Sequence, residues 1–300
     1  MNASAKYFDP ETLSRIGPLG LRARTLVEGL IAGLHRSPLR GHSIEFAQHR
    51  EYTPGDDTRQ IDWKVYARSD KYYLKQYEDE TSLICTLLLD TSESMTFRGP
   101  KSSLSKLEIG QLIAAALGYL ILSQQDACGF GTFSQGLDAW LQPSSSPVQF
   151  DDLVRVMEQS NVERKSDIYR SVSDCAAHLS HAGMVVIISD LFDDVDRLGR
   201  ALKLLKYERQ DVLVLQVLDP IEINFELDRT TKFVGLEQLP SLTADPRLIG
   251  AAYRKAMRTL LDSIAAECRQ LDVDHHLITT DQSLAHALAQ VLARRRLVRG

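Results

Sequence analysis

The 300-residue sequence lacks the marks of several large protein classes. Its four cysteines lie far apart without a Cys-x-x-Cys pair, which favours reduced, buried thiols over a disulfide framework or a zinc site. The amino terminus has no apolar core of a signal peptide. The longest apolar stretch, residues 112–122, is about half of the roughly 20 residues that span a bilayer. We therefore expect a cytoplasmic protein without a transmembrane segment.

The sequence also lacks a basic surplus and the common catalytic motifs. A formal net charge of −5 argues against nucleic-acid binding as the main task. The Gly-x-Ser-x-Gly motif of many hydrolases is absent, and Pro100 interrupts a stretch that would otherwise resemble a phosphate-binding loop. His275 and His276 are adjacent on a predicted strand, so they point to opposite faces and cannot chelate one metal ion together. The apolar runs and the polar residues that follow them hold more information.

Residues 83–95 carry the most informative pattern. The apolar run 83–89 has the length and composition of a strand that is buried on both faces of a parallel sheet. Asp90, Ser92 and Ser94 then alternate at the end of this strand, where open α/β sheets bind their ligands. One carboxylate and two hydroxyls are hard oxygen ligands of the kind that hold Mg²⁺ or Mn²⁺. The pattern therefore indicates a divalent metal site.

The Asp-x-Ser-x-Ser arrangement of residues 90–94 resembles the metal-ion-dependent adhesion site of von Willebrand factor type A domains. Those domains place a Gly-Thr-Asp-like sequence in a second loop and an aspartate in a third loop. The resemblance assigns Ser166 to the position of the threonine, because serine keeps the coordinating hydroxyl. It assigns Asp190, which follows the apolar strand 184–188, to the third loop. The metal ligands that it implies are Asp90, Ser92, Ser94, Ser166 and Asp190.

Ser166 has a second interpretation. A serine that precedes a helix commonly accepts a hydrogen bond from a backbone N–H and so caps the helix. In that case its hydroxyl would not contact metal. The aspartates at positions 193, 194 and 196 are expected at the start of the following helix, where negative charge complements the helix dipole.

A second resemblance lies in residues 50–68, which read Arg-x-Tyr-x-Pro-Gly-Asp-Asp-x-Arg-x-Ile-Asp-Trp-x-x-x-Ala-Arg. This stretch resembles the signature of a bacterial family, domain-of-unknown-function family fifty-eight. Its members carry a type A-like domain and tend to be encoded beside MoxR-type AAA+ ATPases. The resemblance implies a MoxR-type ATPase and an unknown client protein as partners. We expect Trp63 and the neighbouring arginine–aspartate pairs to organise the fold; a docking surface for the ATPase is the alternative.

Apolar strand patterns and helical patterns alternate through the rest of the chain. From residue 82 to residue 296 this alternation implies right-handed crossovers and a mainly parallel sheet. We predict an α/β fold with a doubly wound, mainly parallel, type A-like (Rossmann-like) sheet over residues 80–300, after a small α+β segment of residues 1–79. Residues 220–248 are expected to be irregular. Strands are expected over residues 83–89, 127–133, 137–141, 184–188, 212–218 and 273–279, and helices over residues 106–124, 149–159, 249–271 and 282–296.

These observations together predict a metal-dependent protein-binding module rather than an enzyme. The enzymatic alternative is a Mg²⁺-dependent phosphoryl-transfer hydrolase that uses Asp90 as its nucleophile. Enzymes similar to the haloacid dehalogenases carry a second aspartate two positions further on, which serves as acid and base. This chain has Ser92 there, and a serine cannot do that work near neutral pH.

Overall fold

The computed structural model describes residues 19–34, 49–51, 73–75, 83–160, 162, 166–226, 231–233, 242–244 and 246–298. The chain divides into two compact units, one of residues 1–34 and 83–300 and the other of residues 35–82. The division differs from the boundary expected after residue 79, because helix α2 (Leu19–Leu34) packs against the larger unit. The expectation for Trp63 and most of the signature around it falls outside the described residues.

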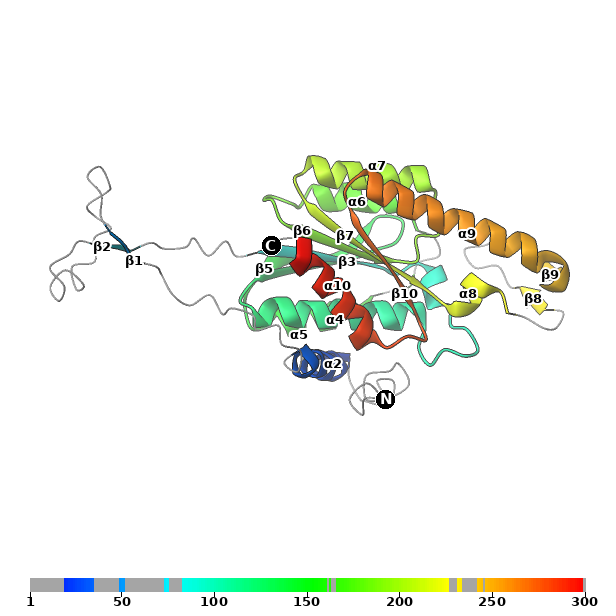
Figure 1. The fold of residues 1–300 in the computed structure, drawn as a ribbon, viewed down its shortest axis with the longest axis horizontal. Coiled ribbons are helices and arrows are strands. Elements are labelled where there is room, and N and C mark those ends of the chain that lie inside the picture. The colour runs from blue at the N-terminus through cyan, green and yellow to red at the C-terminus, as the bar shows by residue number, and fades with distance from the viewer. Residues whose placement is uncertain are drawn as a thin grey trace. The chain divides into compact units, whose positions relative to one another are not determined.

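The larger unit contains a six-stranded sheet in the order β10-β7-β6-β3-β4-β5 (Figure 1). Its strands all run parallel to their neighbours, except for the antiparallel edge pair of β4 and β5. Numbered in chain order, the six strands follow the order that defines a doubly wound sheet, with the first and fourth side by side. The predicted fold is therefore confirmed. The strands are β3 (Ile84–Asp90), β4 (Ala127–Phe133), β5 (Leu137–Ser144), β6 (Met184–Ser189), β7 (Asp211–Leu218) and β10 (Asp274–Thr279).

Helices cover both faces of this sheet, so residues of the inner strands β3, β4, β6 and β7 are buried on both sides (Figure 1). In β3, Leu87 and Leu89 face one core while Leu88 faces the other, as the two-residue period of a strand requires. The first core lies under α2, α4 (Lys106–Ser123), α5 (Gln149–Gln159) and α10 (Leu284–Val298). The second lies under α6 (Ile168–Ala176), α7 (Val195–Tyr207) and α9 (Pro246–Gln270).

Helix α4 lies closest to the central strand. Its capping box, in which Ser105 and Glu108 bond each other's backbone N–H groups, sets where the helix begins. Gly110 lets the helix approach β3, because a Cβ at that position would lie 2.8 Å from a methyl carbon of Leu89. By length and composition α4 is, among the described helices, the one candidate for a membrane span, yet 61% of it is buried inside the domain.

Residues 220–248 were expected to be irregular, but they contain a short helix and a pair of strands. A short helix, α8 (Pro220–Asn224), follows β7 directly, and β8 (Thr231–Phe233) pairs antiparallel with β9 (Leu242–Ala244). Helix α9 begins at Pro246 rather than at residue 249. Pro220 and Pro246 each stand at the first position of a helix, where proline is well tolerated. Asp219 and the third helical residue of α8 complete a capping box there.

The smaller unit is described only at β1 (His49–Glu51) and β2 (Tyr73–Lys75), which pair antiparallel. Both strands lie within residues 1–79, the part of the chain predicted as a small α+β segment.

Candidate metal centre

The candidate site lies where the strand order of the sheet reverses. Strands β3 and β6 are neighbours, and the chain leaves them in opposite directions, towards β4 and towards β7. A crevice forms at such a point, beyond the carboxyl ends of the strands. Asp90 ends β3 and Asp190 directly follows β6, so both carboxylates reach the same place. We call this region the carboxyl edge; its members are residues 90–94, Ser134, Ser166, Ser189, Asp190, Asp219 and Glu222.

The Asp-x-Ser-x-Ser segment forms a tight turn at the end of β3. Asp90 is 1% exposed, and its Oδ1 accepts a hydrogen bond of 2.9 Å from the backbone N–H of Ser92. The hydroxyls of Ser92 and Ser94 share a hydrogen bond of 3.1 Å and are buried. A 3₁₀ helix, η3 (Glu93–Thr96), continues the turn. The structure therefore brings these three predicted residues together.

Ser166 belongs to the same cluster. Its hydroxyl donates to Asp90 Oδ2 over 3.3 Å. The cap of helix α6 is the neighbouring Asp167, whose Oδ1 accepts a hydrogen bond of 3.1 Å from the N–H of Arg170. The interpretation of Ser166 as a helix cap is therefore wrong. Its hydroxyl instead faces the carboxylate at the centre of the predicted site.

Asp190 is buried and already holds a cation. Its Oδ2 accepts a hydrogen bond of 2.8 Å from the ammonium group of Lys106, while its Oδ1 accepts one of 3.2 Å from the N–H of Phe192. The same ammonium group donates to Glu222 Oε1 over 2.7 Å. Sequence reasoning missed Lys106 and Glu222. One signal was present: Lys106 is the first residue of a helix, where positive charge is unfavourable.

Two serines of the carboxyl edge were also missed. Ser189, the last residue of β6, donates to Asp90 Oδ2 over 2.6 Å and accepts from the N–H of Leu191. Ser134 follows β4, and its buried hydroxyl has no hydrogen-bond partner within the described structure. Each is a polar residue at the end of an apolar strand, and that is the signal that could have selected them.

Burial and charge shape the ionisation of the carboxyl edge. Burial, helped by the negative charge of Asp190, raises the pKa of Asp90 from 3.8 to about 7. Burial also raises the pKa of Glu222, although Lys106 acts in the opposite direction. For Lys106 burial lowers the pKa, but the two carboxylates outweigh it and the pKa lies above its ordinary value. When Asp90, Asp190 and Glu222 are ionised, these three carboxylates are accompanied by one ammonium group, that of Lys106.

The chemistry of this set fits Mg²⁺ or Mn²⁺. The hydroxyls of Ser166 and Ser189 donate to Asp90. Lys106 compensates one of the three carboxylates of Asp90, Asp190 and Glu222, and the remaining two equal the charge of one divalent ion. Within the described residues no group of three or more His, Cys, Asp or Glu side chains could hold a metal. A site of few carboxylates plus hydroxyls suits Mg²⁺, which keeps several of its waters. It does not suit zinc, which prefers nitrogen and sulfur ligands.

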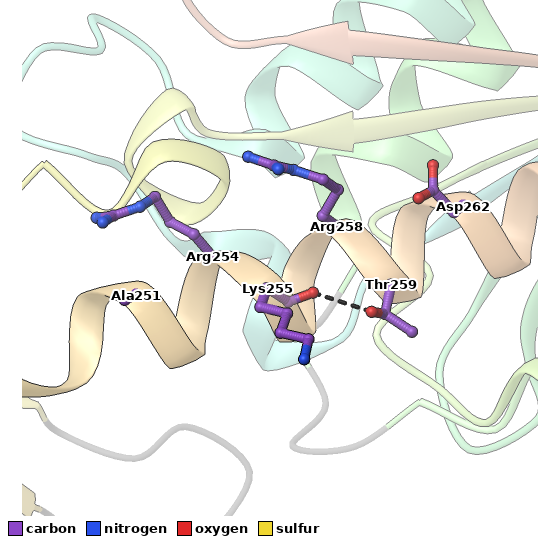
Figure 2. A pocket seen from close by; sticks show the side chains of 6 residues that line it. All are labelled: Ala251, Arg254, Lys255, Arg258, Thr259 and Asp262. Atoms are coloured by element: carbon purple, nitrogen blue, oxygen red, sulfur yellow. Dashed lines mark hydrogen bonds between the residues drawn. The ribbon is translucent and has the colours of Figure 1, made fainter.

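A second charged feature lies on helix α9. An open hollow of about 310 Å³ runs along it, and Figure 2 shows its lining residues on successive turns of this one helix. Its basic members are exposed and make no ion pair with any described residue. Because one helix supplies the whole lining, the hollow is a surface feature. We call it the basic face of α9; it comprises Arg254, Lys255 and Arg258.

The fold and the carboxyl edge define a doubly wound α/β domain with an oxygen-rich site at its switch point. A family model described as "Protein of unknown function DUF58" matches residues 48–259, more than half of the chain. The chain therefore belongs to the DUF58 family, and the resemblance seen in residues 50–68 is confirmed. The family model says nothing of a MoxR-type ATPase, and that partnership stays a prediction.

The chain is similar in sequence to proteins of two mycobacteria. Uncharacterized proteins of Mycobacterium bovis and Mycobacterium tuberculosis are each 26% identical over 219 residues, which is 72% of this chain and 68% of theirs. Similar solved structures include an aerotolerance-related membrane protein from Bacteroides fragilis, with 14% identity, a TM-score of 0.48 and coverage of 71% of this chain and 97% of that one.

The SpRpn10 VWA domain is a further similar structure, with 13% identity, a TM-score of 0.41 and coverage of 69% of this chain and 94% of that one. Both TM-scores are below 0.5. The fold assignment therefore rests on the strand order and register of this chain itself.

Proposed function

We propose that this DUF58 chain is a protein-interaction module whose carboxyl edge binds Mg²⁺ or Mn²⁺ and presents it to an acidic group of a partner protein. One observation carries the proposal. The hydroxyls of Ser166 and Ser189 and the backbone N–H of Ser92 donate to the buried carboxylate of Asp90 at the switch point, and the edge retains more carboxylates than ammonium groups. The proposed metal-site residues are Asp90, Ser92, Ser94, Ser166 and Asp190.

The residues of this site have different tasks. Asp90 supplies the central carboxylate, and Ser189 with the N–H of Ser92 fixes its orientation. The hydroxyls of Ser92, Ser94 and Ser166 supply neutral oxygen atoms that add no charge. A bound divalent ion would supply a positive centre that an aspartate or glutamate of a partner completes.

The geometry favours binding over hydrolysis. A phosphoryl-transfer hydrolase with a carboxylate nucleophile needs an acid–base group beside that nucleophile. Ser92 stands two positions after Asp90, where a hydrolase of that class carries its acid–base aspartate, and a serine cannot do that work near neutral pH. The hydroxyl of Ser92 therefore disfavours the phosphoryl-transfer alternative.

The partners that we propose are a MoxR-type AAA+ ATPase and a client protein that the two mature or assemble together in the cytoplasm. The support for this part is membership of the DUF58 family. An acidic segment on either partner would match the proposed metal centre. Affinity capture from native lysate with and without EDTA, using wild type and Asp90→Ala, tests it: the ATPase should be retained only by wild type in the presence of metal.

Metal binding by the purified full-length chain is the first test. After EDTA treatment, Mg²⁺ should raise the melting temperature, because a ligand that binds only the native state stabilises it by about 2.7 kcal/mol at 100 times its Kd. Asp90→Ala should abolish the shift. Asp262→Ala, which removes an exposed carboxylate of α9, is the control and should show the same shift in melting temperature as wild type. Identical melting curves of wild type with and without metal would refute the proposed site.

The Ser166 hydroxyl separates metal binding from a purely structural role. Ser166→Ala should weaken Mg²⁺ binding in isothermal titration. Ser166→Thr should preserve or tighten it, because threonine keeps the hydroxyl and is stiffer at χ1. Equal affinities in all three proteins would remove Ser166 from the ligand set.

A further inference from the structure

Lys106 stands where a positive charge is unfavourable for two reasons. Its side chain is 0% exposed, so the ammonium group has lost its hydration, which costs several kcal/mol for a buried ion. It is also the first residue of α4, and the amino end of a helix carries partial positive charge. A leucine or methionine there would avoid both penalties.

Several elements hold the ammonium group in place. Asp190 lies 2.8 Å away and Glu222 lies 2.7 Å away. The ring of Phe192 lies with its centroid 4.6 Å from Nζ, within the range of a cation–π contact. Glu222 is itself fixed, because its Oε2 accepts a hydrogen bond of 2.8 Å from the N–H of Asp219. Residues that follow β6 and β7, together with Glu222 of α8, therefore fix the position of the ammonium group.

We propose that Lys106 is a positioning residue of the metal centre, an internal counter-ion that holds Asp190 and sets how much negative charge the carboxyl edge offers to a cation. The inference rests on the proposed function, since it assigns a role within the same site. With Lys106 in place, two of the three carboxylates of Asp90, Asp190 and Glu222 remain uncompensated and match a divalent ion. Without it all three remain, which favours a trivalent ion.

The same contacts define the role of Asp190. One of its oxygens is bonded to Lys106 and the other to the N–H of Phe192. Asp190 therefore contributes mainly through its charge, which acts on Asp90 across the switch point. The neutral hydroxyls around Asp90 are left to contact the ion, together with water and the partner's carboxylate.

The test measures Mg²⁺ and Tb³⁺ affinity by calorimetry and terbium luminescence on the EDTA-treated full-length chain. Lys106→Met removes the positive charge and should tighten Mg²⁺ binding about tenfold and Tb³⁺ binding more, as Coulomb attraction grows with ion charge. Glu222→Gln removes a negative charge and should weaken Mg²⁺ binding about tenfold. Lys255→Met, an exposed change on α9, should alter neither.

Opposite shifts in Lys106→Met and Glu222→Gln support the inference. If wild type binds Mg²⁺ while both variants shift in the same direction or not at all, Lys106 is merely structural; the inference fails and the proposed function stands. Metal binding by Lys106→Met alone would overturn both the inference and the proposed function, because a wild type that binds no metal has no metal centre for Lys106 to position. Binding by none of the proteins would overturn both.

Folding of the variants is checked by circular dichroism. If Lys106→Met does not fold, the Mg²⁺ affinity of Glu222→Gln alone tests the inference, because this variant leaves the ion pair between Lys106 and Asp190 in place. An unchanged or tighter Mg²⁺ affinity in Glu222→Gln would then overturn the inference.

Discussion

The carboxyl edge and the basic face of α9 both concentrate charge, but only the first buries it. Lys106 is 0% exposed and lies between two carboxylates. Arg254, Lys255 and Arg258 are exposed and make no ion pair with described residues. Buried charges interact strongly and must be paired, whereas exposed charges are screened by solvent and contribute little to stability. The first arrangement suits a preformed site, and the second suits adjustable contacts on a surface.

The two regions meet through α8. Glu222 lies in this short helix, and Phe225, which caps its end, stacks on Tyr253 of α9 with ring centroids 4.3 Å apart. Burial, with the negative charge of Glu222 nearby, raises the pKa of Tyr253 to about 12. The phenol thus stays neutral beside the buried ions. Stability measurements can test whether the two regions differ as much as their burial suggests.

The largest difference is expected between two lysine variants. In the absence of metal, Lys106→Met should lower the free energy of unfolding by about 3–5 kcal/mol, because it leaves buried carboxylates without their partner. Lys255→Met, on the exposed basic face, should change it by no more than about 0.5 kcal/mol. Urea unfolding monitored by circular dichroism measures both. Similar small effects would mean that the buried lysine contributes no more than a surface charge.

A pH series tests the buried negative charge of the same edge. The pKa of Asp90 is about 7 in the native state and 3.8 in the unfolded chain, so between these values the native state holds a proton that the unfolded chain lacks. The metal-free protein should therefore lose stability as pH rises from about 4 to 7, by about 1 kcal/mol per pH unit from this group.

Asp90→Asn isolates this contribution, because the difference between its unfolding free energy and that of wild type removes all other titrating groups. That difference should grow in favour of the variant as pH rises and level off above pH 7. Urea unfolding at half-unit pH steps in EDTA gives the curve. A difference that does not change with pH would show that Asp90 is ionised throughout.

Two glycine variants give the smallest expected effects. A Cβ on Gly99 would collide with the carboxylate of Asp219 and lie 2.7 Å from its Cγ. That carboxylate cannot yield, because it accepts hydrogen bonds from Ser102, Thr280 and two backbone N–H groups. Gly99→Ala should therefore cost about 1–3 kcal/mol, as overpacking does.

The matched control for Gly99 lies in α9. A Cβ on Gly250 would meet the flexible end of Arg254 at 3.1 Å, which can move aside. Gly250→Ala should be neutral or stabilising by up to about 1 kcal/mol, because alanine favours a helix. Thermal unfolding of both variants compares them. Equal losses would mean that the edge around Asp219 is no tighter than the surface of α9.

Much of the fold follows from local patterns in the sequence. The uninterrupted apolar runs at β3, β6 and β7 predicted strands buried on both faces, because only a covered parallel sheet buries both sides of a strand. The start of α7 was predicted as well, since Asp194 caps it. Helix boundaries are harder to predict, because proline breaks the interior of a helix yet is well tolerated at its first position, where Pro220 and Pro246 stand.

The sequence by itself determined that Asp90, Ser92 and Ser94 lie together, because they are neighbours in one turn. Only the tertiary structure decided that Lys106 and Glu222 share a buried ion pair, since the two are 116 positions apart. It also turned the Ser166 hydroxyl towards Asp90, while Asp167 caps the helix. The physical reason is that charge pairing depends on burial and distance. Burial and distance are both set when the strand ends meet at the switch point, so the local sequence does not predict them.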